Sequence, residues 1–273
     1  MAGIKQYTGL LMAALITSGC SFFSADKPPG DIPVTFTDLE AGDNCLYQLN
    51  VNGEQWNLDY LAFYLSQPRL KIDGRWQPVA FKPGPWQSKK LALMQFHSAC
   101  NTEANHTVIK LDTNQQLLDR ASAIQFTLGV PFDSNHVISD HQAPPLNNSV
   151  MFQSIRQGHS FMRIELQQAS AQAGLWSFML ASGECQGSND DETPQQCDKP
   201  NRITLDLPLK ANVQDLRLVA KLSQILFRAD MPVGQECNLA GQYAQSCRKV
   251  LRNLTSREWI RWDAPHQAYL KQD

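Results

Sequence analysis

The chain has 273 residues, of which 42% are hydrophobic and 18% are charged. A chain of this length and composition buries a full hydrophobic core, either as one large all-β domain or as two small domains. The formal net charge of −2 excludes the strongly basic surface that nucleic-acid binding requires.

Residues 1–19 have the features of a secretory signal, with an apolar run far shorter than the roughly 20 residues that span a bilayer. The segment ends in Thr17-Ser18-Gly19-Cys20, which resembles the bacterial lipobox, although Thr17 stands where that motif prefers leucine. We expect cleavage before Cys20, with ordinary signal cleavage nearby as the alternative. An acylated Cys20 anchors a protein to a bilayer. Because Ser21 rather than aspartate follows, we expect the outer membrane, with residues 20–32 as a lipid-anchored tether.

Short β-like runs follow one another along the mature chain, separated by turn signals such as Asn52-Gly53 and Asp73-Gly74. We expect strands at 33–39, 45–51, 58–65, 91–96, 106–111, 123–130, 160–166, 175–182 and 202–209. Two segments, 219–227 and 244–254, have the pattern of short helices. The sequence therefore predicts an all-β fold, a single β-sandwich domain over residues 33–262 with one or two short helices and a C-terminal tail over 263–273.

Seven cysteines are present, and setting aside the lipid-bearing Cys20 leaves an even number, as expected in an oxidising compartment. Six cysteines allow 15 pairings. The spacing favours one of them: Cys185 with Cys197, Cys237 with Cys247, and Cys45 with Cys100. A zinc site is disfavoured, because neither a CxxC nor a CxxxC motif occurs. We therefore expect structural disulfides.

No enzymatic motif is present: the chain lacks GxSxG, HExxH, GxGxxG and the Walker loop, and we expect a protein that is not an enzyme. The remaining chemistry is that of soft ligands. Imidazole and thioether groups together suit copper, and thioether favours Cu(I). The candidates are scattered singly, and methionines in strands are more typically core residues. They are His97, His106, His136, His141, His159, His266, Met94, Met151, Met162 and Met179.

His136 has a distinctive position among these candidates. The alternating strand FTLGV (126–130) is ended by Pro131, and the polar turn that follows ends in His136. Loops just past strand ends often carry function. The alternative interpretation is an ordinary surface histidine.

Two stretches of the sequence, FTLGVPFDSNHV and APPLNNSVMFQSIRQGHSFMRIEL, resemble the MbnP family. Its members are also called methanobactin-associated or metallo-mystery-pair four-Cys-motif proteins. The resemblance continues upstream through LAFYLSQPRL and WQSKKLALMQF, and downstream through FMLASGEC and CDKPNRITLDL. It spans roughly residues 34 to 247, in the same order.

The resemblance implies a periplasmic, copper-binding, β-rich protein that works with a dihaem cytochrome c peroxidase-like partner. In this family the partner oxidises a tryptophan of the copper protein to kynurenine, which takes part in the copper site. Carried onto this chain, the Asn-His pair of the motif is Asn135-His136, and the Trp-Gln pair is Trp86-Gln87. The resemblance therefore predicts His136 as a metal ligand and Trp86 as the residue that is oxidised.

Three positions depart from the family pattern, since Ser66, Ser88 and Met179 stand where family sequences often carry histidine. If the site is rebuilt, His97 and Met179 join His136 and Trp86 around Cu(I), with His141 and His159 as further options. The expected function is then a copper-binding lipoprotein in copper acquisition or storage. If the site is lost, the protein is a copper-free structural or interaction lipoprotein of the outer membrane.

Overall fold

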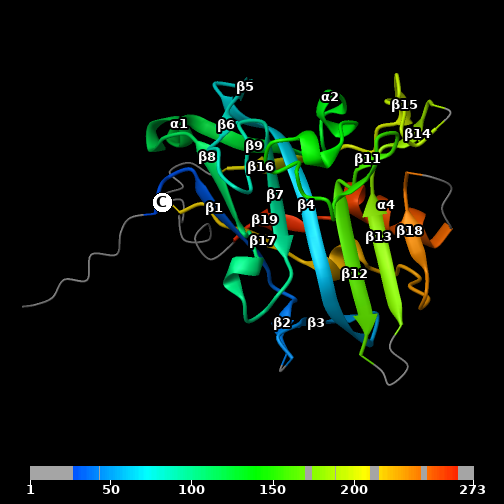
Figure 1. Cartoon of the computed structure of the whole chain (residues 1–273). Helices are drawn as coiled ribbons and strands as arrows, with labels where there is room; N and C mark the ends of the chain where they lie inside the picture. The colour runs from blue at the N-terminus through cyan, green and yellow to red at the C-terminus, as the bar shows by residue number, and fades with distance from the viewer. Residues whose placement is uncertain are drawn as a thin grey trace, which may run out of the picture.

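A computed structural model describes residues 27–42, 44–169, 174–187, 189–209, 215–240 and 245–263. The fold is a β-sandwich, which confirms the predicted fold class (Figure 1). One sheet has five strands in the order β19-β17-β1-β8-β6, where β1 is Asp31–Phe36, β6 Ala80–Phe81, β8 Val108–Asp112, β17 Leu218–Ala220 and β19 Ile260–Trp262.

The second sheet has ten strands, with β16-β9-β4-β12-β13-β18 as its main path and β2, β3, β5 and β7 attached beside it. Its strands are β2 (Glu40–Ala41), β3 (Tyr47–Val51), β4 (Glu54–Ile72), β5 (Arg75–Pro78), β7 (Leu91–Phe96), β9 (Ala121–Leu128), β12 (Met162–Gln168), β13 (Leu175–Leu180), β16 (Ile203–Pro208) and β18 (Glu236–Asn238). Two separate hairpins are β10 (Phe152–Ser154) with β11 (Gly158–His159), and β14 (Gly183–Cys185) with β15 (Cys197–Lys199).

Aromatic side chains join the two sheets in the core. Phe36 of β1 packs edge-on against Phe96 of β7, with ring centroids 4.9 Å apart, and Phe81 of β6 stacks on Phe126 of β9 at 6.2 Å. All four rings are buried. Because burying a large apolar side chain stabilises by roughly 1.5–3 kcal/mol, these contacts hold one sheet against the other.

The 19-residue strand β4 organises the larger sheet, because one of its edges pairs with two strands in succession. β12 pairs with the first part of β4, and β9 pairs with the last part. At the junction, the Tyr64 N–H donates to the Phe161 carbonyl (2.9 Å), and the Tyr64 carbonyl accepts from the Gly129 N–H (3.0 Å). The segment between residues 130 and 160 therefore leaves and rejoins the sheet at one point on β4.

The described residues form four short α-helices: α1 (Gln115–Arg120), α2 (Phe132–Asn135), α3 (Leu222–Ile225) and α4 (Gln245–Ser256). The helix predicted at 244–254 is α4. The segment predicted as helix at 219–227 is divided between β17 and α3. Neither α1 nor α2 was expected: α1 is one short helix capped by the Asn114 side chain, and α2 is a single turn after Pro131, and both are too short to show helical periodicity.

Three disulfides connect Cys45 with Cys100, Cys185 with Cys197, and Cys237 with Cys247, which is the pairing that the spacing favours. Cys20 and most of the tail lie outside the described residues. The fold begins before the expected boundary at residue 33. β1 starts at Asp31, and Lys27 Nζ donates to the Leu216 carbonyl at 2.8 Å. In the described part of the chain, no helix is long and apolar enough to cross a membrane.

Candidate functional site

His136 lies where the chain turns out of α2. Pro131 precedes the helix, its fixed φ of −59° suits a helix start, and His136 is the residue that ends it. The side chain is buried, with 3% of the residue exposed, so His136 is not an ordinary surface histidine. Its ring lies against Phe132, with centroids 4.7 Å apart.

The orientation of the His136 ring is set by its Nδ1 atom, which lies 2.9 Å from the Ile155 carbonyl oxygen. A carbonyl oxygen only accepts hydrogen bonds, so Nδ1 carries the proton and Nε2 presents a lone pair. Burial lowers the pKa of His136 below its usual value, against the opposing effect of the carbonyls of Ile155 and Arg156. The neutral ring that a metal ligand requires is thus the favoured form.

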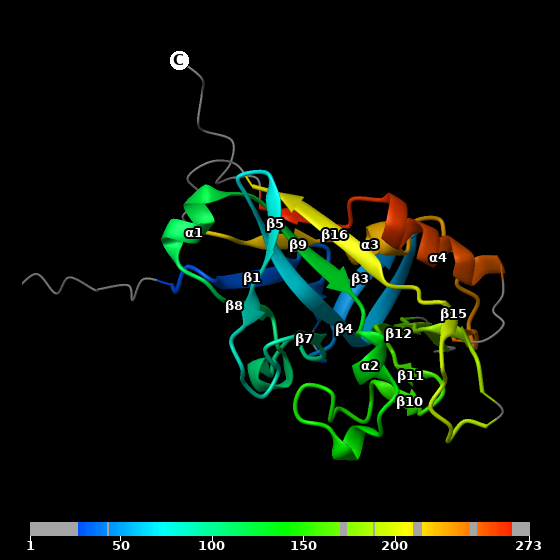
Figure 2. The ribbon, with the colours of Figure 1, turned by 90° about the horizontal axis from the view of Figure 1, so that it is seen from above.

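The lone pair of Nε2 faces sulfur. The Cys197 Sγ lies 3.7 Å from Nε2, and the Asn135 Nδ2 lies 3.3 Å from it. The Nε2 of His136 and the Sγ atoms of Cys185 and Cys197 all lie within 4.8 Å of one another. Figures 1 and 2 show why: α2, β11 and the β14–β15 hairpin gather at the same end of the molecule.

Asn135 supports this arrangement from beneath. It is fully buried, and its Oδ1 accepts from the His159 N–H at 2.9 Å. Gly158 passes so close that a Cβ there would lie 2.2 Å from Asn135 Nδ2. Both ring nitrogens of His159 lie 3.0 Å from carbonyl oxygens, those of Asn135 and Leu146. His159 therefore fixes the loop and has no ring nitrogen directed at a metal.

His97 and Met179, the other two predicted protein ligands, lie in different surroundings. His97 is exposed at the end of β7, and its Nδ1 lies 2.7 Å from the Asp59 carbonyl. β7 runs away from α2 (Figure 1). Met179 is buried in β13, directly opposite Arg163 of β12, so both side chains share one face of the sheet. The group of possible ligands around His136 includes no other histidine.

Trp86 is partly buried and stacks on His106, with ring centroids 5.4 Å apart and planes 10° from parallel. The His106 Nδ1 in turn lies 2.6 Å from the Leu93 carbonyl. Both rings line a cavity of about 440 Å³ whose rim carries Lys82 and Lys110. The ring that stacks on Trp86 is therefore that of His106, which was among the candidate histidines but was not expected beside Trp86.

Two of the three positions where the family pattern often has histidine, Ser66 and Ser88, take part in hydrogen bonds. Ser66 is buried, and its Oγ accepts from Arg202 Nη2 at 3.3 Å. The same guanidinium donates to the Gln67 Oε1 at 2.8 Å, and burial lowers the pKa of Arg202. The Ser88 Oγ accepts from the Leu91 N–H in a turn. Since a guanidinium repels cations, the place beside Ser66 does not suit a copper ion.

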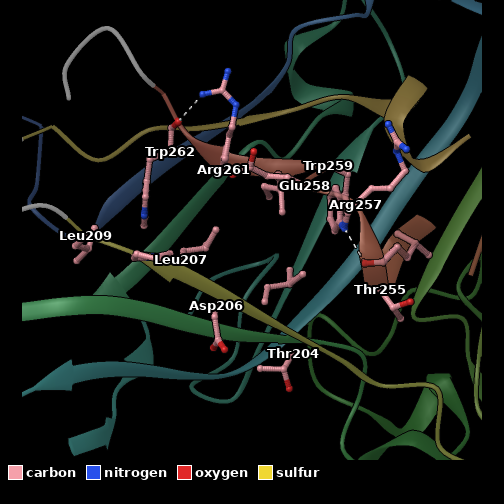
Figure 3. Close-up of a pocket in the computed structure, with 14 residues that line it drawn as sticks. Thr204, Asp206, Leu207, Leu209, Thr255, Arg257, Glu258, Trp259, Arg261 and Trp262 are labelled. Carbon is pink, nitrogen blue, oxygen red and sulfur yellow. Dashed lines mark hydrogen bonds between the residues drawn. The ribbon is translucent and has the colours of Figure 1, made fainter. Parts of the chain in front are cut away.

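A further cavity of about 440 Å³ lies between β16 and the segment that joins α4 to β19 (Figure 3). Its lining includes Leu207, Arg257 and Trp262, but no histidine, cysteine or methionine. Within the described residues, the buried Nε1 of Trp262 has no hydrogen-bond partner. The chemistry of this cavity suits a peptide or another organic group better than a soft metal.

Comparison with known proteins decides the family. The family model described as MbnP matches residues 30–247. The chain belongs to the MbnP family. Among solved structures, it is similar to MbnP from Methylosinus trichosporium, with a TM-score of 0.63 and 19% sequence identity over 81% of this chain and 86% of that chain. At this identity the likeness shows a shared fold. No curated protein matches the chain in sequence.

Within its described residues, this member of the MbnP family brings one group of possible soft-metal ligands together. His136 contributes a neutral, oriented imidazole, and two sulfurs lie beside it. His136 was predicted from the sequence as a ligand, whereas Cys185 and Cys197 were predicted only as a structural disulfide. The two cysteines are far from His136 in the sequence, so the sequence does not indicate this group of three. The β14–β15 pairing and the loop after α2 bring the three residues together. No residue pattern near Cys197 indicates His136 as a neighbour.

Proposed function

We propose that this MbnP family member is a copper-binding lipoprotein that faces the periplasm from the outer membrane. It takes part in copper acquisition or storage, together with a dihaem cytochrome c peroxidase-like partner that oxidises a tryptophan. The observation that carries the proposal is the buried His136 ring, whose Nδ1 is held by a carbonyl and whose Nε2 faces Cys197 Sγ. Cu(I) bound there would be held by the soft donors that it prefers.

A Cu(I) titration of residues 21–273 against a competing chelator tests the metal site. The parent is expected to bind one equivalent, and His136→Ala to bind far more weakly. His97→Ala tests whether that histidine belongs to the site, and His141→Ala, at an exposed position, controls for the loss of a histidine. Absence of binding by the parent, both with its disulfides intact and after their reduction, would contradict the proposal.

Trp86 is proposed as the residue that the partner oxidises. It lies beside a cavity open to solvent, with a second ring stacked on it, whereas Trp176 is fully buried in the core. After incubation with a dihaem partner and its oxidant, peptide mass analysis is expected to find oxidation at Trp86 and none at Trp176. Oxidation of both to the same extent would instead indicate unspecific damage.

Anchoring at Cys20 is proposed from the sequence alone. Replacing Cys20 by alanine is expected to move the protein from the membrane fraction to the soluble periplasmic fraction, because a lipid-free chain has no acyl group to insert. Metabolic labelling with a fatty acid measures the same event directly.

The second candidate function is a copper-free interaction lipoprotein, and two observations favour it. Arg202 lies against Ser66, where the family pattern has a ligand. In addition, β16 and β19 end their sheets in the described part of the chain, and a cavity lies between them (Figure 3). A partner strand adds readily to such an edge. The copper titration separates this candidate from the first.

A further inference from the structure

We propose that the Cys185–Cys197 disulfide is a redox switch for metal binding: a dithiol reductant opens it, and the two thiolates then bind one Cu(I) ion together with the Nε2 of His136. The inference rests on the proposed function, since it assumes that copper binds at His136. To the proposed function it adds Cys185 and Cys197 as ligands. It also adds the condition that the site is complete only when these two cysteines are reduced.

The geometry of the three donor atoms supports a single metal ion. Zn–S bonds are near 2.3 Å and Zn–N bonds near 2.0–2.1 Å, so two donors of one such ion are separated by about 4 Å. The three donors lie within 4.8 Å of one another, and Cys197 Sγ is 3.7 Å from Nε2. Small side-chain rotations after reduction therefore suffice to place all three around one ion of similar size.

The imidazole is oriented before any metal arrives. The Nδ1–H···O contact to Ile155 fixes the ring and leaves Nε2 unprotonated. This is the arrangement typical of metal-bound histidines, whose second ring nitrogen donates to a carbonyl or carboxylate. The competing contact, from Asn135 Nδ2 at 3.3 Å, is long and is lost easily when a ligand takes its place.

The hairpin that carries the cysteines does not depend on the disulfide alone. Cys185 and Cys197 are directly opposite in the β14–β15 pair, and the Gln186 N–H donates to the Gln196 carbonyl at 2.9 Å. The connecting loop is held to the neighbouring hairpin by Arg156. The guanidinium of Arg156 donates to the Asp190 Oδ1 at 2.6 and 2.9 Å, and the Arg156 backbone N–H donates to the Asp190 carbonyl at 3.0 Å. These contacts keep the two sulfurs near each other, and near His136, after reduction.

Accessibility distinguishes this disulfide from the others. Cys185 and Cys197 are half-buried, so a reductant reaches them, whereas Cys237 and Cys247 are fully buried. Cys45–Cys100 is also accessible, but it contributes to no group of three possible metal ligands in the described residues. Among the three disulfides, only Cys185–Cys197 combines access with a neighbouring histidine.

The chemistry balances with a dithiol as co-reactant. One thiolate of the reductant attacks a sulfur of the Cys185–Cys197 bond, and the other cysteine leaves as a thiolate. The second thiol of the reductant then resolves the mixed disulfide, so that two electrons pass to the protein and the reductant becomes a disulfide. Binding of Cu(I) releases the proton of each cysteine thiol that is still protonated. Exchange with a disulfide oxidant, which accepts two electrons and becomes a dithiol, re-forms the Cys185–Cys197 bond and releases the ion.

The test compares Cu(I) affinity before and after reduction. Residues 21–273 are reduced with dithiothreitol, desalted without oxygen and titrated with Cu(I) against a chelator, while differential alkylation and peptide mass show which disulfides are open. Reduction is expected to raise the affinity by about 100-fold or more, because two soft anionic ligands are added. A thiolate-to-copper charge-transfer band is expected to appear in the ultraviolet at the same time.

Matched variants identify which residues cause the gain in Cu(I) affinity on reduction. Cys45→Ser/Cys100→Ser is expected to keep the full gain on reduction, whereas Cys185→Ser/Cys197→Ser and His136→Ala are expected to lose it. If the second double variant fails to fold, alkylating Cys185 and Cys197 in the reduced parent gives the same comparison. Equal affinity in both redox states would overturn the switch and leave copper binding at His136 intact. Absence of binding in both states would overturn the proposed function itself.

Discussion

At the scale of single residues, the candidate site depends on groups that never touch a metal. His136 is oriented by the Ile155 carbonyl, and its neighbour Asn135 is held by the backbone of His159. His136 itself was predictable, because a histidine directly after a strand end and a proline stands out in the sequence. The orientation of the His136 ring was not predictable, because its partner is the backbone carbonyl of Ile155 and the isoleucine side chain gives no sign of that contact.

The buried histidines predict how stability depends on pH. Burial lowers the pKa of His106, His136 and His159 below the usual 6.5. In the unfolded chain all three titrate near 6.5, so below that pH the unfolded state binds protons that the folded state does not. The free energy of unfolding is therefore expected to fall as the pH drops from 7.5 to 5.5, a range above the titration of ordinary carboxylates.

Urea unfolding of the metal-free protein at several pH values measures this dependence. His106→Gln is expected to flatten this dependence in part, because the variant removes one of the three histidines whose pKa is lowered. A free energy of unfolding that stays constant, or rises, as the pH falls through this range would contradict the account.

At the scale of elements, the sequence predicted long alternating strands well and short pieces poorly. β7, β12, β13 and β16 lie within a residue or two of their expected bounds, or inside them. In β12 and β16 one buried face imposes a period of two, whereas β7 and β13 are apolar runs buried over most of their length. The one-turn α2 carries no such signal. The extended β4 exceeds its predicted length because both of its ends find partners, β3 at one end and β5 at the other.

The close contact between β11 and the end of α2 gives a prediction with a matched control. Gly158 (φ +75°) and Gly74 (φ +78°) have the same left-handed backbone, but only Gly158 has a neighbour where a Cβ would lie. Alanine at either position is expected to cost about 1–2 kcal/mol from the backbone alone. Gly158→Ala is expected to cost about 1–3 kcal/mol more, because the new methyl group collides with Asn135.

Urea unfolding of the two alanine variants measures the difference, and Cu(I) affinity is expected to fall in Gly158→Ala only. Equal loss of stability in the two variants would show that β11 moves away from Asn135 freely, and that the support of His136 is looser than the structure indicates.

At the scale of the whole molecule, three disulfides connect the fold, and they differ most in the length of chain that they close. Cys45–Cys100 closes a separation of 55 residues, against 12 for Cys185–Cys197. In the chain-entropy model these loops correspond to about 4 and about 3 kcal/mol of stabilisation. The long-range bridge thus carries more of the stability, which leaves the shorter one free to open without unfolding the domain.

Removing each accessible disulfide tests that division. Cys45→Ser/Cys100→Ser is expected to lower the free energy of unfolding by about 1 kcal/mol more than Cys185→Ser/Cys197→Ser does. The measurement is urea unfolding at pH 7.5 without metal. A larger loss in the second variant would indicate that the β14–β15 hairpin is a structural necessity and not a switch.

The central claim is that copper binds at His136, and a crystal of the reduced protein soaked with Cu(I) tests it most directly. An anomalous difference map recorded at the copper absorption edge locates the ion without reference to any variant. The account predicts one strong peak next to the His136 Nε2, between the sulfurs of Cys185 and Cys197. A peak elsewhere, for example between His106 and Trp86, or no peak at all, would contradict it.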